Sequence, residues 1–500
     1  MLKERELTSW QADFLFVALL AVLYVLFGLT EFVYSPPFGI HFMRQTDGLS
    51  FAMNYHLFDN SFWKPELLSV RWANGQAANE FPILYYLTSL CYDAFGVSHF
   101  WLRAINLAIF TLGLVWLQRL AFLIFESRVY SFVIGIFLIS SAVVLYYSAN
   151  HLPDVPAMSL VLGGIYFWFK NQKSKKPIDP AFSFALFTLA GLLKVTMMIY
   201  PIAILMIGLI QQITTDERRG SLKPLILFGT LSAICVGGWN YYMLEYNIEA
   251  GSNAFLTRAL PVWEYEEWFI TMVWGFITEY WSVSVLPLTI WHILFALFFF
   301  QILFFKSSNK ELATLTAVSF AGSVAYMALF YAQFENHDYY FIVVMPTIVL
   351  ILMNAFATIK NRFPKLGNSM VFKILLIVFV GIGMADSHKK LSKRFEVLPI
   401  TNFHVGLEGI QETLDEHGIT KEARFLVLGD FSPNGSLCFL QRKGLTFKDQ
   451  EQLDVIDPNH LPEFKLDHML VIHNNWETEV PSTLVKEVIF SSERYSIYGL

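Results

Sequence analysis

The sequence predicts an all-α polytopic membrane protein that ends in a small soluble α/β domain. Of its 500 residues, 55% are hydrophobic and 15% are charged, whereas soluble domains carry about 25% charged residues. Several apolar runs approach the ~17–25 residues that a helix needs to cross the hydrocarbon core of a bilayer. They cover residues 14–30, 132–147, 225–242, 291–305, 312–330, 341–356 and 374–385. Together with less regular segments, they predict about eleven transmembrane helices.

The first apolar run, residues 14–30, has a length that suits either a signal peptide or a span. The segment before it, MLKERELTSWQAD, is nearly neutral, and no small-residue cleavage site follows the run. We therefore expect an uncleaved first span. After it, residues 31–81 form a polar loop rich in aromatic side chains, where a membrane enzyme would act on a lipid-borne substrate.

Three further segments are apolar but irregular: residues 81–96, 181–209 and 270–286. The stretch 181–209 is too long for one span and too short for two, and Lys194 lies in its middle. This pattern predicts two short helices that meet near Lys194. A break of this kind is tolerated within a membrane only where protein or a water-filled cavity lines it.

Basic and acidic loops alternate along the chain. The basic loops carry Arg119 and Arg128; Lys170, Lys173, Lys175 and Lys176; Arg218, Arg219 and Lys223; Lys306 and Lys310; and Lys360, Arg362 and Lys365. The loops between them are acidic or neutral, at 31–81, 151–154, 264–267 and 335–338. By the positive-inside rule the basic loops face the cytoplasm, so the candidate chemistry falls on the non-cytoplasmic face.

The composition changes after residue 386, and residues 387–500 alternate like a soluble α/β unit. Residues 405–417 have helical spacing, 424–430 and 468–474 are typical of buried strands, and the end of the chain predicts a hairpin. With a cytoplasmic N-terminus, an odd number of spans places this domain outside the cell. A basic cluster argues against that placement: His388, Lys389, Lys390, Lys393 and Arg394. Residues 1–386 would form the membrane domain.

Several classes of protein are disfavoured. Lys and Arg are scattered among short loops, so no basic stripe indicates nucleic-acid binding. The three cysteines, Cys91, Cys235 and Cys438, lie far apart and form neither a disulfide framework nor a CxxC metal site. The histidines show no HExxH or comparable ligand spacing.

One block carries a family resemblance. It reads EFPILYYLTSLCYDAFGVSHFWLRAINL from Glu80, and then LYYSANHLPDVPA, which ends at Ala157. These strings resemble the dolichyl-phosphate-mannose-protein mannosyltransferase superfamily, especially its bacterial, aminoarabinose-transferase-like members. GLLKVT at 191–196 and HDYYFIVVMP at 337–346 are also similar to family motifs. The resemblance covers residues 10–390 and does not include the C-terminal tail.

The resemblance implies a GT-C fold and a glycosyltransferase that uses a polyprenyl-phosphate-linked sugar. The acceptor would be a lipid, a glycan or a protein, and membrane lipids would surround the enzyme. It also implies the bacterial inner membrane, with the site facing the periplasm or exterior. Many members carry two adjacent acids in the first loop, whereas here Gly48 follows Asp47. A divalent metal therefore stays an open question, and Glu80 or Asp154 would supply any second charge.

Within this family chemistry, carboxylates and cations have separate tasks. A base must take the proton of the acceptor hydroxyl while the sugar passes through an oxocarbenium-like state. Asp47 is the expected base, with Asp154 and Glu80 as supporting acids. The lipid phosphate that leaves needs fixed positive charge. Its expected partners are Lys194, Arg44, His337 and Tyr340.

Each of these residues also has an ordinary structural interpretation. Asp47 and Asp154 could cap helices, and Glu80 could be a solvated loop residue. Lys194 could extend its ammonium to the membrane surface, and so could Arg103, for which we expect that role. Tyr340 could belong to the interfacial aromatic belt.

Two other functions stay open. A transporter or flippase of a lipid-linked sugar would also need intramembrane charge and broken helices. No inverted repeat is visible, however, and the polar residues gather on one face rather than at the midplane. A ligase that moves whole glycans would share the fold and the chemistry of a glycosyltransferase.

Overall fold

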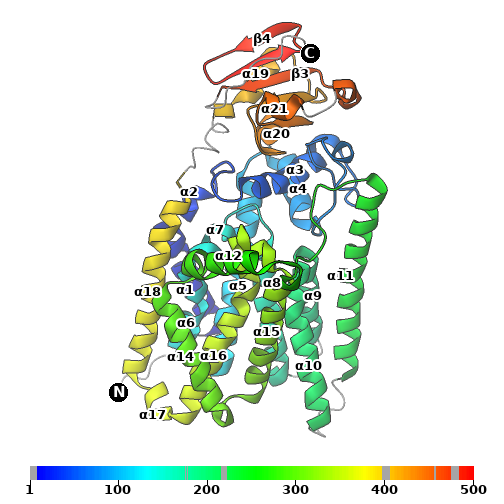
Figure 1. The fold of residues 1–500 in the computed structure, drawn as a ribbon. Helices are drawn as coiled ribbons and strands as arrows, with labels where there is room; N and C mark the ends of the chain where they lie inside the picture. Colours follow the sequence, from blue (N-terminus) through cyan, green and yellow to red (C-terminus); the bar gives the residue numbers. More distant parts are fainter. Residues whose placement is uncertain are drawn as a thin grey trace.

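The computed structural model describes residues 8–174, 176, 178–214, 222–396, 406–454, 458–473 and 484–500. Helices form a bundle, and a small sheet domain sits on one end of it (Figure 1). Parts of the predicted segments lie outside the described residues, namely Lys175, Arg218, Arg219, Val405 and Asn474.

The α-helices of the bundle follow one another through the first 394 residues. They are α1 (Ser9–Leu26), α2 (Leu29–Phe32), α3 (Phe42–Phe58), α4 (Ile83–Phe95), α5 (Phe100–Phe125), α6 (Arg128–Gly135), α7 (Ala142–Ser148), α8 (Asp154–Ser174), α9 (Ile178–Leu193), α10 (Ile199–Thr214), α11 (Leu222–Ala250), α12 (Glu267–Gly275), α13 (Ser282–Val285), α14 (Leu288–Leu303), α15 (Lys310–Leu329), α16 (Met345–Arg362), α17 (Pro364–Gly367) and α18 (Met370–Arg394). Short helical turns join them: η1 (Ala73–Gly75), η2 (Phe137–Ser140), η3 (Val195–Met198), η5 (Val262–Glu264), η6 (Phe276–Trp281), η7 (Phe305–Ser307), η8 (Tyr331–Glu335) and η9 (Asp338–Val344).

Long single helices make up part of the predicted set of membrane spans. Among the described residues, six are long and apolar enough, and α12 to α14 add a seventh if that pair, bent by 98°, is one span. The expected number of about eleven counted apolar runs that are broken or short in the structure. Residues 132–147, for example, are divided among α6, η2 and α7, because the Ser141 hydroxyl accepts a hydrogen bond from the Val144 backbone N–H (3.2 Å) and starts a new helix.

The predicted break at Lys194 is present. α9 ends at Leu193, Lys194 is extended (φ −153°, ψ 102°), and η3 then leads into α10. Both α9 and α10 are too short to count as full spans. The polar backbone at the break is still bonded, since the Lys194 N–H reaches the Ala190 carbonyl (2.8 Å) and the Met197 N–H reaches the Lys194 carbonyl (2.9 Å). Both backbone groups of Lys194 therefore stay hydrogen-bonded where the chain turns.

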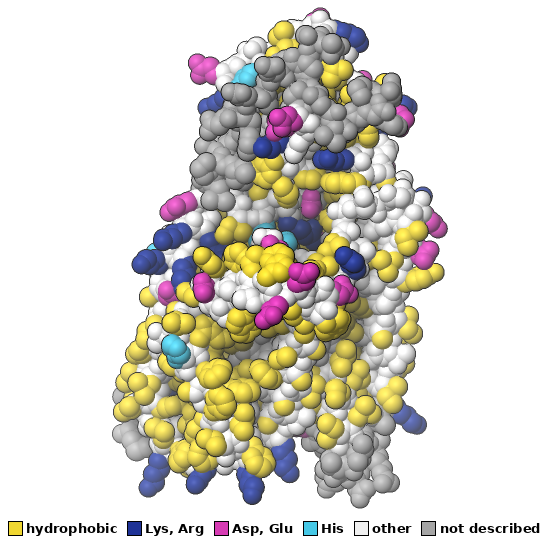
Figure 2. Space-filling view, in the orientation of Figure 1, with side chains coloured by type: hydrophobic (Ala, Val, Ile, Leu, Met, Phe, Trp, Pro, Cys, Tyr) yellow, Lys and Arg dark blue, Asp and Glu magenta, His cyan; other side chains and the backbone are white. Residues whose placement is uncertain are grey.

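The two ends of the bundle differ in charge. Hydrophobic side chains cover most of its lower surface, and Lys and Arg side chains gather along the edge that lies opposite the sheet domain (Figure 2). The α17 turn and its neighbours lie at this edge, while α3 and α4 lie at the end next to the sheet (Figure 1). Within the described part of the chain, the basic α17 turn and the 31–81 loop thus lie at opposite ends, in agreement with the alternation of charge.

The C-terminal domain contains a five-stranded sheet in the order β2-β1-β3-β5-β4. Its elements are α19 (Ile410–Glu416), β1 (Phe425–Leu428), α20 (Gly435–Leu440), β2 (Gly444–Phe447), α21 (Gln450–Asp454), η11 (Pro458–Phe464), β3 (His468–Ile472), β4 (Glu487–Ser491) and β5 (Tyr495–Gly499). β1 lies parallel to β2 and β3, and β5 lies antiparallel to β3 and β4. The two predicted strands and the terminal hairpin are present, whereas β2 was not predicted.

The 31–81 loop is joined to this sheet through backbone hydrogen bonds. Ser69 forms a parallel bridge with Gly444: the Val70 N–H donates to the Gly444 carbonyl (2.9 Å), and the Gly444 N–H donates to the Leu68 carbonyl (3.1 Å). A Cβ at Gly444 would collide with the Phe425 carbonyl, so a glycine is required where the loop meets the sheet. The loop therefore acts as an extra edge strand next to β2.

Two arginines are buried, one expected to anchor a helix at the membrane surface and one counted in the basic cluster of residues 388–394. Arg103 is fully buried rather than extended to the membrane surface, because it donates to the carbonyls of Ala149 (2.9 Å) and Pro36 (3.0 Å). Arg394, in the basic cluster of α18, pairs with the buried Asp338 at 2.5 Å. This pairing accounts for one charge of the cluster that argued for a cytoplasmic domain.

We predict that the end of the bundle next to the sheet domain faces away from the cytoplasm. In a chain whose three cysteines are replaced by alanine, Asn253→Cys should react with a membrane-impermeant maleimide in intact cells, and Ser174→Cys should not. Both positions are exposed in the structure, so both should react once the cells are permeabilised. Labelling of Ser174→Cys alone in intact cells would reverse the orientation.

Candidate active site

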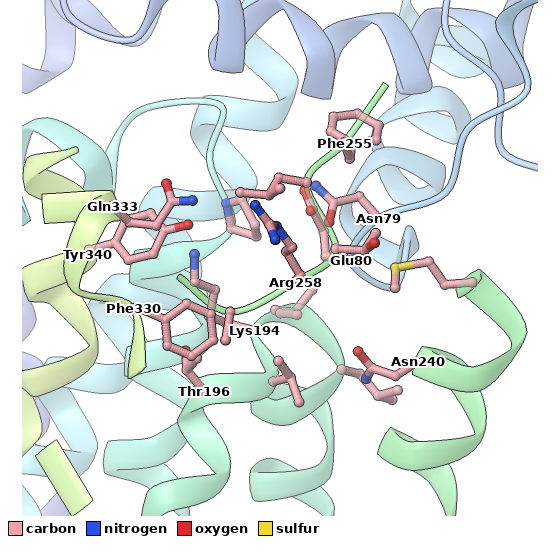
Figure 3. Close-up of a pocket in the computed structure, with 18 of the residues that line it drawn as sticks. Asn79, Glu80, Lys194, Thr196, Asn240, Phe255, Arg258, Phe330, Gln333 and Tyr340 are labelled. Carbon is pink, nitrogen blue, oxygen red and sulfur yellow. The ribbon is translucent and has the colours of Figure 1, made fainter. Parts of the chain in front are cut away.

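A cavity of about 540 Å³ opens where the membrane helices meet the 31–81 loop. It is bounded by the break at Lys194, by α11, by the 254–259 loop and by the segment that leads into η9 (Figure 3). Five of the seven residues that the sequence singled out line it: Arg44, Glu80, Lys194, His337 and Tyr340. These come from segments far apart in the chain, and the fold brings them together.

Lys194 lines this cavity. Its Nζ lies 2.8 Å from Oδ1 of Asp154, which is 1% exposed. The Tyr340 and Tyr339 rings lie 4.7 Å and 5.3 Å from the same nitrogen, within the range of a cation–π contact. In Figure 3 the ammonium lies near Tyr340 and Gln333. Lys194 is therefore held at the cavity by a buried carboxylate and two rings.

A second ion pair forms the opposite wall. Arg44 on α3 donates to Oε1 of Glu80 at 2.5 Å, and the Tyr85 hydroxyl donates to the same oxygen. The Glu80 side chain is 8% exposed, so it is not a solvated loop residue. Burial would raise the pKa of Glu80, but the Arg44 guanidinium outweighs it and holds the pKa below its ordinary value. Glu80 is therefore a weak base.

Asp47 lies one helical turn after Arg44 and does not line the cavity itself. It is inside α3, whose N-terminal cap is His41, so the interpretation of Asp47 as a helix cap is wrong. Its Oδ1 accepts a hydrogen bond from the side-chain amide of Asn434 (2.9 Å), a residue of the C-terminal domain. Burial raises the pKa of Asp47 to about 6, although Arg44 and Asn434 act in the opposite direction.

The three acids thus differ in their capacity to accept a proton. Asp154 is held by Lys194 and Glu80 by Arg44, at distances that leave each in a close ion pair. Among the described residues, Asp47 makes no such pair, and its pKa is raised. A general base works best when its pKa lies near the operating pH, so Asp47 is the best suited of the three.

His337 contributes to the cavity in a different way from the cations. Its ring stacks on His41 with centroids 5.2 Å apart, and its Nδ1 lies 3.1 Å from the Gln333 carbonyl oxygen. Burial lowers the pKa of His337 to about 4, and His41 acts in the same direction. The imidazole is uncharged at neutral pH. Because a carbonyl oxygen only accepts, Nδ1 carries the hydrogen and the neutral Nε2 is an acceptor, so His337 in this state offers a phosphate neither a hydrogen bond nor positive charge.

The structure adds a cation that the sequence analysis missed. Arg258 lies in the loop after α11 and faces the cavity alongside Lys194 (Figure 3). It is exposed, and no ion pair links it to a carboxylate within the described part of the chain. Arg258 is the sole Lys or Arg between Lys223 and Lys306. A lone basic residue in an otherwise acidic outer loop was the signal that could have found it.

Polar groups without charge complete the lining. Asn79, Thr196, Asn240 and Gln333 were also not predicted. As for a metal, no group of three or more His, Cys, Asp or Glu side chains suited to hold one occurs among the described residues. The possible second acids for such a metal, Glu80 and Asp154, are both engaged with cations.

Comparisons with known proteins agree with this picture of the fold. Residues 79–239 match the family model of the dolichyl-phosphate-mannose-protein mannosyltransferases, which confirms the resemblance drawn from the motifs. The structure is similar to ArnT from Cupriavidus metallidurans, both in the apo state and bound to undecaprenyl phosphate. Each comparison gives 12% identity, 97% coverage of both chains and a TM-score of 0.62.

A second likeness is more distant. The apo form of the Archaeoglobus fulgidus oligosaccharyltransferase has 10% identity and a TM-score of 0.51, and the match covers 90% of this chain and 69% of that one. No curated protein matches the sequence. At these identities the structural likeness shows the fold, so the predicted GT-C architecture is confirmed.

Proposed function

We propose that this membrane protein with the GT-C fold is a glycosyltransferase that moves a sugar from a polyprenyl-phosphate donor to an acceptor hydroxyl. The observation that carries the proposal is the division of charge at the site. Lys194, Arg44 and Arg258 all border one cavity, and an acid of raised pKa lies one helical turn from Arg44. A transfer from a sugar phosphate needs both groups.

The cations suit the leaving group. When the bond between the anomeric carbon and the phosphate oxygen breaks, the phosphate gains negative charge, and fixed donors stabilise it without reorganisation. Lys194 and Arg44 are each held in place by a carboxylate, while Arg258 has no such partner among the described residues. Arg258 is therefore the cation with charge left to give to the phosphate, and the other two position their charges around it.

Asp47 suits the proton transfer. The acceptor oxygen attacks the anomeric carbon, its proton passes to the Asp47 carboxylate, and the lipid phosphate leaves. A single displacement of this kind inverts the anomeric configuration. As the pH falls through about 6, Asp47 becomes protonated and cannot accept a proton, so we expect the rate to decline on the acid side.

The nature of the donor rests on the comparisons and on the cavity. The family model concerns transferases that use dolichyl-phosphate mannose, and one similar structure holds undecaprenyl phosphate. Here Leu192, Trp239 and Met243 line the cavity beside its charged groups, which gives a prenyl chain an apolar wall. The proposed setting is the bacterial plasma membrane, with the site on the outer face. The acceptor would be a lipid, a glycan or a protein.

The proposal predicts a covalent product in a single compartment. Purified protein in detergent, given a polyprenyl-phosphate sugar and an envelope extract as the source of acceptor, should release free lipid phosphate and attach the sugar to an acceptor. Mass spectrometry would detect both products. A flippase forms neither product, so movement of the intact donor across liposomes without any covalent product would contradict the proposal.

A further inference from the structure

Asn434 lies in a loop of the C-terminal domain that is held rigid by its own hydrogen bonds. The loop reads GDFSPN between β1 and α20, and Asn434 is fully buried. Oδ1 of Asp430 accepts from the Ser432 N–H (2.7 Å), and its Oδ2 accepts from the Ser436 N–H (2.7 Å). The hydroxyls of both serines donate to the same carboxylate (2.6 Å each). Contacts within the C-terminal domain, all of them to the Asp430 carboxylate, therefore hold this loop in shape.

The contacts of Asn434 determine which way its amide faces. Its oxygen accepts from the Ser50 hydroxyl (3.0 Å) and from the Ser69 backbone N–H (2.9 Å). A backbone N–H can only donate, so the amide oxygen must lie on that side. The amide nitrogen then faces Asp47 and donates to its Oδ1 at 2.9 Å. Rotating the amide would put its oxygen against a carboxylate and its N–H groups against another donor.

We propose that Asn434 is a positioning residue for Asp47, so that the C-terminal domain completes the active site formed by the membrane helices. This inference rests on the function proposed above. The amide holds one carboxylate oxygen of Asp47, and no other hydrogen bond to that carboxylate occurs among the described residues. The second oxygen stays available for the acceptor proton. The Asn434 amide thus makes three hydrogen bonds to the membrane domain, with Ser50, Ser69 and Asp47, and these fix the orientation of the Asp47 carboxylate.

The same amide sets how basic Asp47 is. The charged and titratable groups around Asp47 are Arg44 on its own helix, Glu80 ahead of α4 and Cys438 on α20. Cys438 is buried, and burial raises the pKa of its thiol well above the ordinary value, so it is neutral in the working range. Arg44 and Asn434 favour the carboxylate, whereas burial and Glu80 favour the acid. Without the amide, the pKa of Asp47 must rise.

The test is the pH profile of lipid-phosphate release by the full chain. In the wild type the rate should fall on the acid side near pH 6. In Asn434→Ala we expect the pH at which the rate falls to rise by about one unit, because a hydrogen bond to a charged group is lost. The turnover at neutral pH should drop several-fold, while KM for the donor stays unchanged, because the cavity cations are untouched.

A second variant and a control separate positioning from general damage. Asn434→Asp keeps the shape of the side chain but places a negative charge beside Asp47. The pH at which its rate falls should therefore rise at least as much as in Asn434→Ala. Glu66→Gln weakens another contact between the 31–81 loop and the C-terminal domain, the Glu66–Lys443 pair (2.6 Å). The acid-side fall in its rate should occur at the same pH as in the wild type. If the wild type is active and both Asn434 variants lose activity at the same pH as the wild type, this inference is overturned and the proposed function is not. A wild type that releases no lipid phosphate would overturn the proposed function and this inference with it.

Discussion

The Asp47→Asn variant is expected to lose turnover by about 10²-fold or more while it binds the donor as tightly as the wild type. The amide has the shape of the carboxylate, and its oxygen can still accept the hydrogen bond from Asn434 that the structure shows at 2.9 Å. It cannot take a proton from the acceptor. Because the residue does not line the cavity, the contacts of the donor should not change. Rates of lipid-phosphate release and titration of the donor would measure the two quantities.

Asp59→Asn is the matched control for this experiment. Asp59 ends the same helix, is exposed, and has a positive φ of 48° that an asparagine readily adopts. It should keep full activity. Turnover close to the wild-type value in Asp47→Asn would show that Asp47 is not the base. The proton would then have to go to Glu80 or Asp154, each of which the structure shows in an ion pair.

Lys194→Met is expected to have two effects, on folding and on donor binding. It leaves Asp154, which is 1% exposed, without its partner at the break between α9 and α10. Removal of one member of a buried pair costs ~3–5 kcal/mol, and we expect the lower end because the Lys194 side chain keeps 20% of its exposure. Loss of a charged contact to the phosphate should also weaken donor binding by ~1.5–3 kcal/mol, or roughly 10- to 150-fold.

A double variant separates these two effects. In Lys194→Met with Asp154→Asn, no buried carboxylate is left without a partner, so the thermal unfolding temperature in detergent should return toward that of the wild type. Donor affinity should stay weak, because the cation is still missing. Recovery of both stability and affinity in the double variant would mean that Lys194 serves only to neutralise Asp154, and that Arg44 and Arg258 hold the phosphate without it.

Local sequence patterns predicted the parts of this molecule that depend on neighbours along the chain. A lysine in the middle of an apolar stretch of awkward length implied a broken helix, and the break at Lys194 is there. Alternating charge in the loops indicated which residues share one end of the bundle. Five of the residues that followed from the family resemblance line one cavity. The strands at 425–428 and 468–472 followed from their apolar runs.

Contacts between distant segments could not be predicted in the same way. Asn434 is 387 positions from Asp47, in a domain that the family resemblance did not include, and no periodicity links them. The pairing of Lys194 with Asp154 depends on how α8 packs beside the break. Arg103 was misjudged because the start of an apolar helix suits both a surface anchor and a buried arginine bonded to carbonyls. The division of the apolar run 132–147 at Ser141 was likewise not evident from the sequence.

The most direct test of the proposed transfer is mass spectrometry of lipid-linked sugars and envelope glycans in three strains. One lacks the protein, one carries the wild type and one carries Asp47→Asn. We expect the sugar-loaded polyprenyl phosphate to accumulate in the first and third strains, and one envelope component to lose the mass of a single sugar. The wild type should restore that mass. Unchanged lipid-linked sugars and unchanged glycans in the strain without the protein would contradict the account.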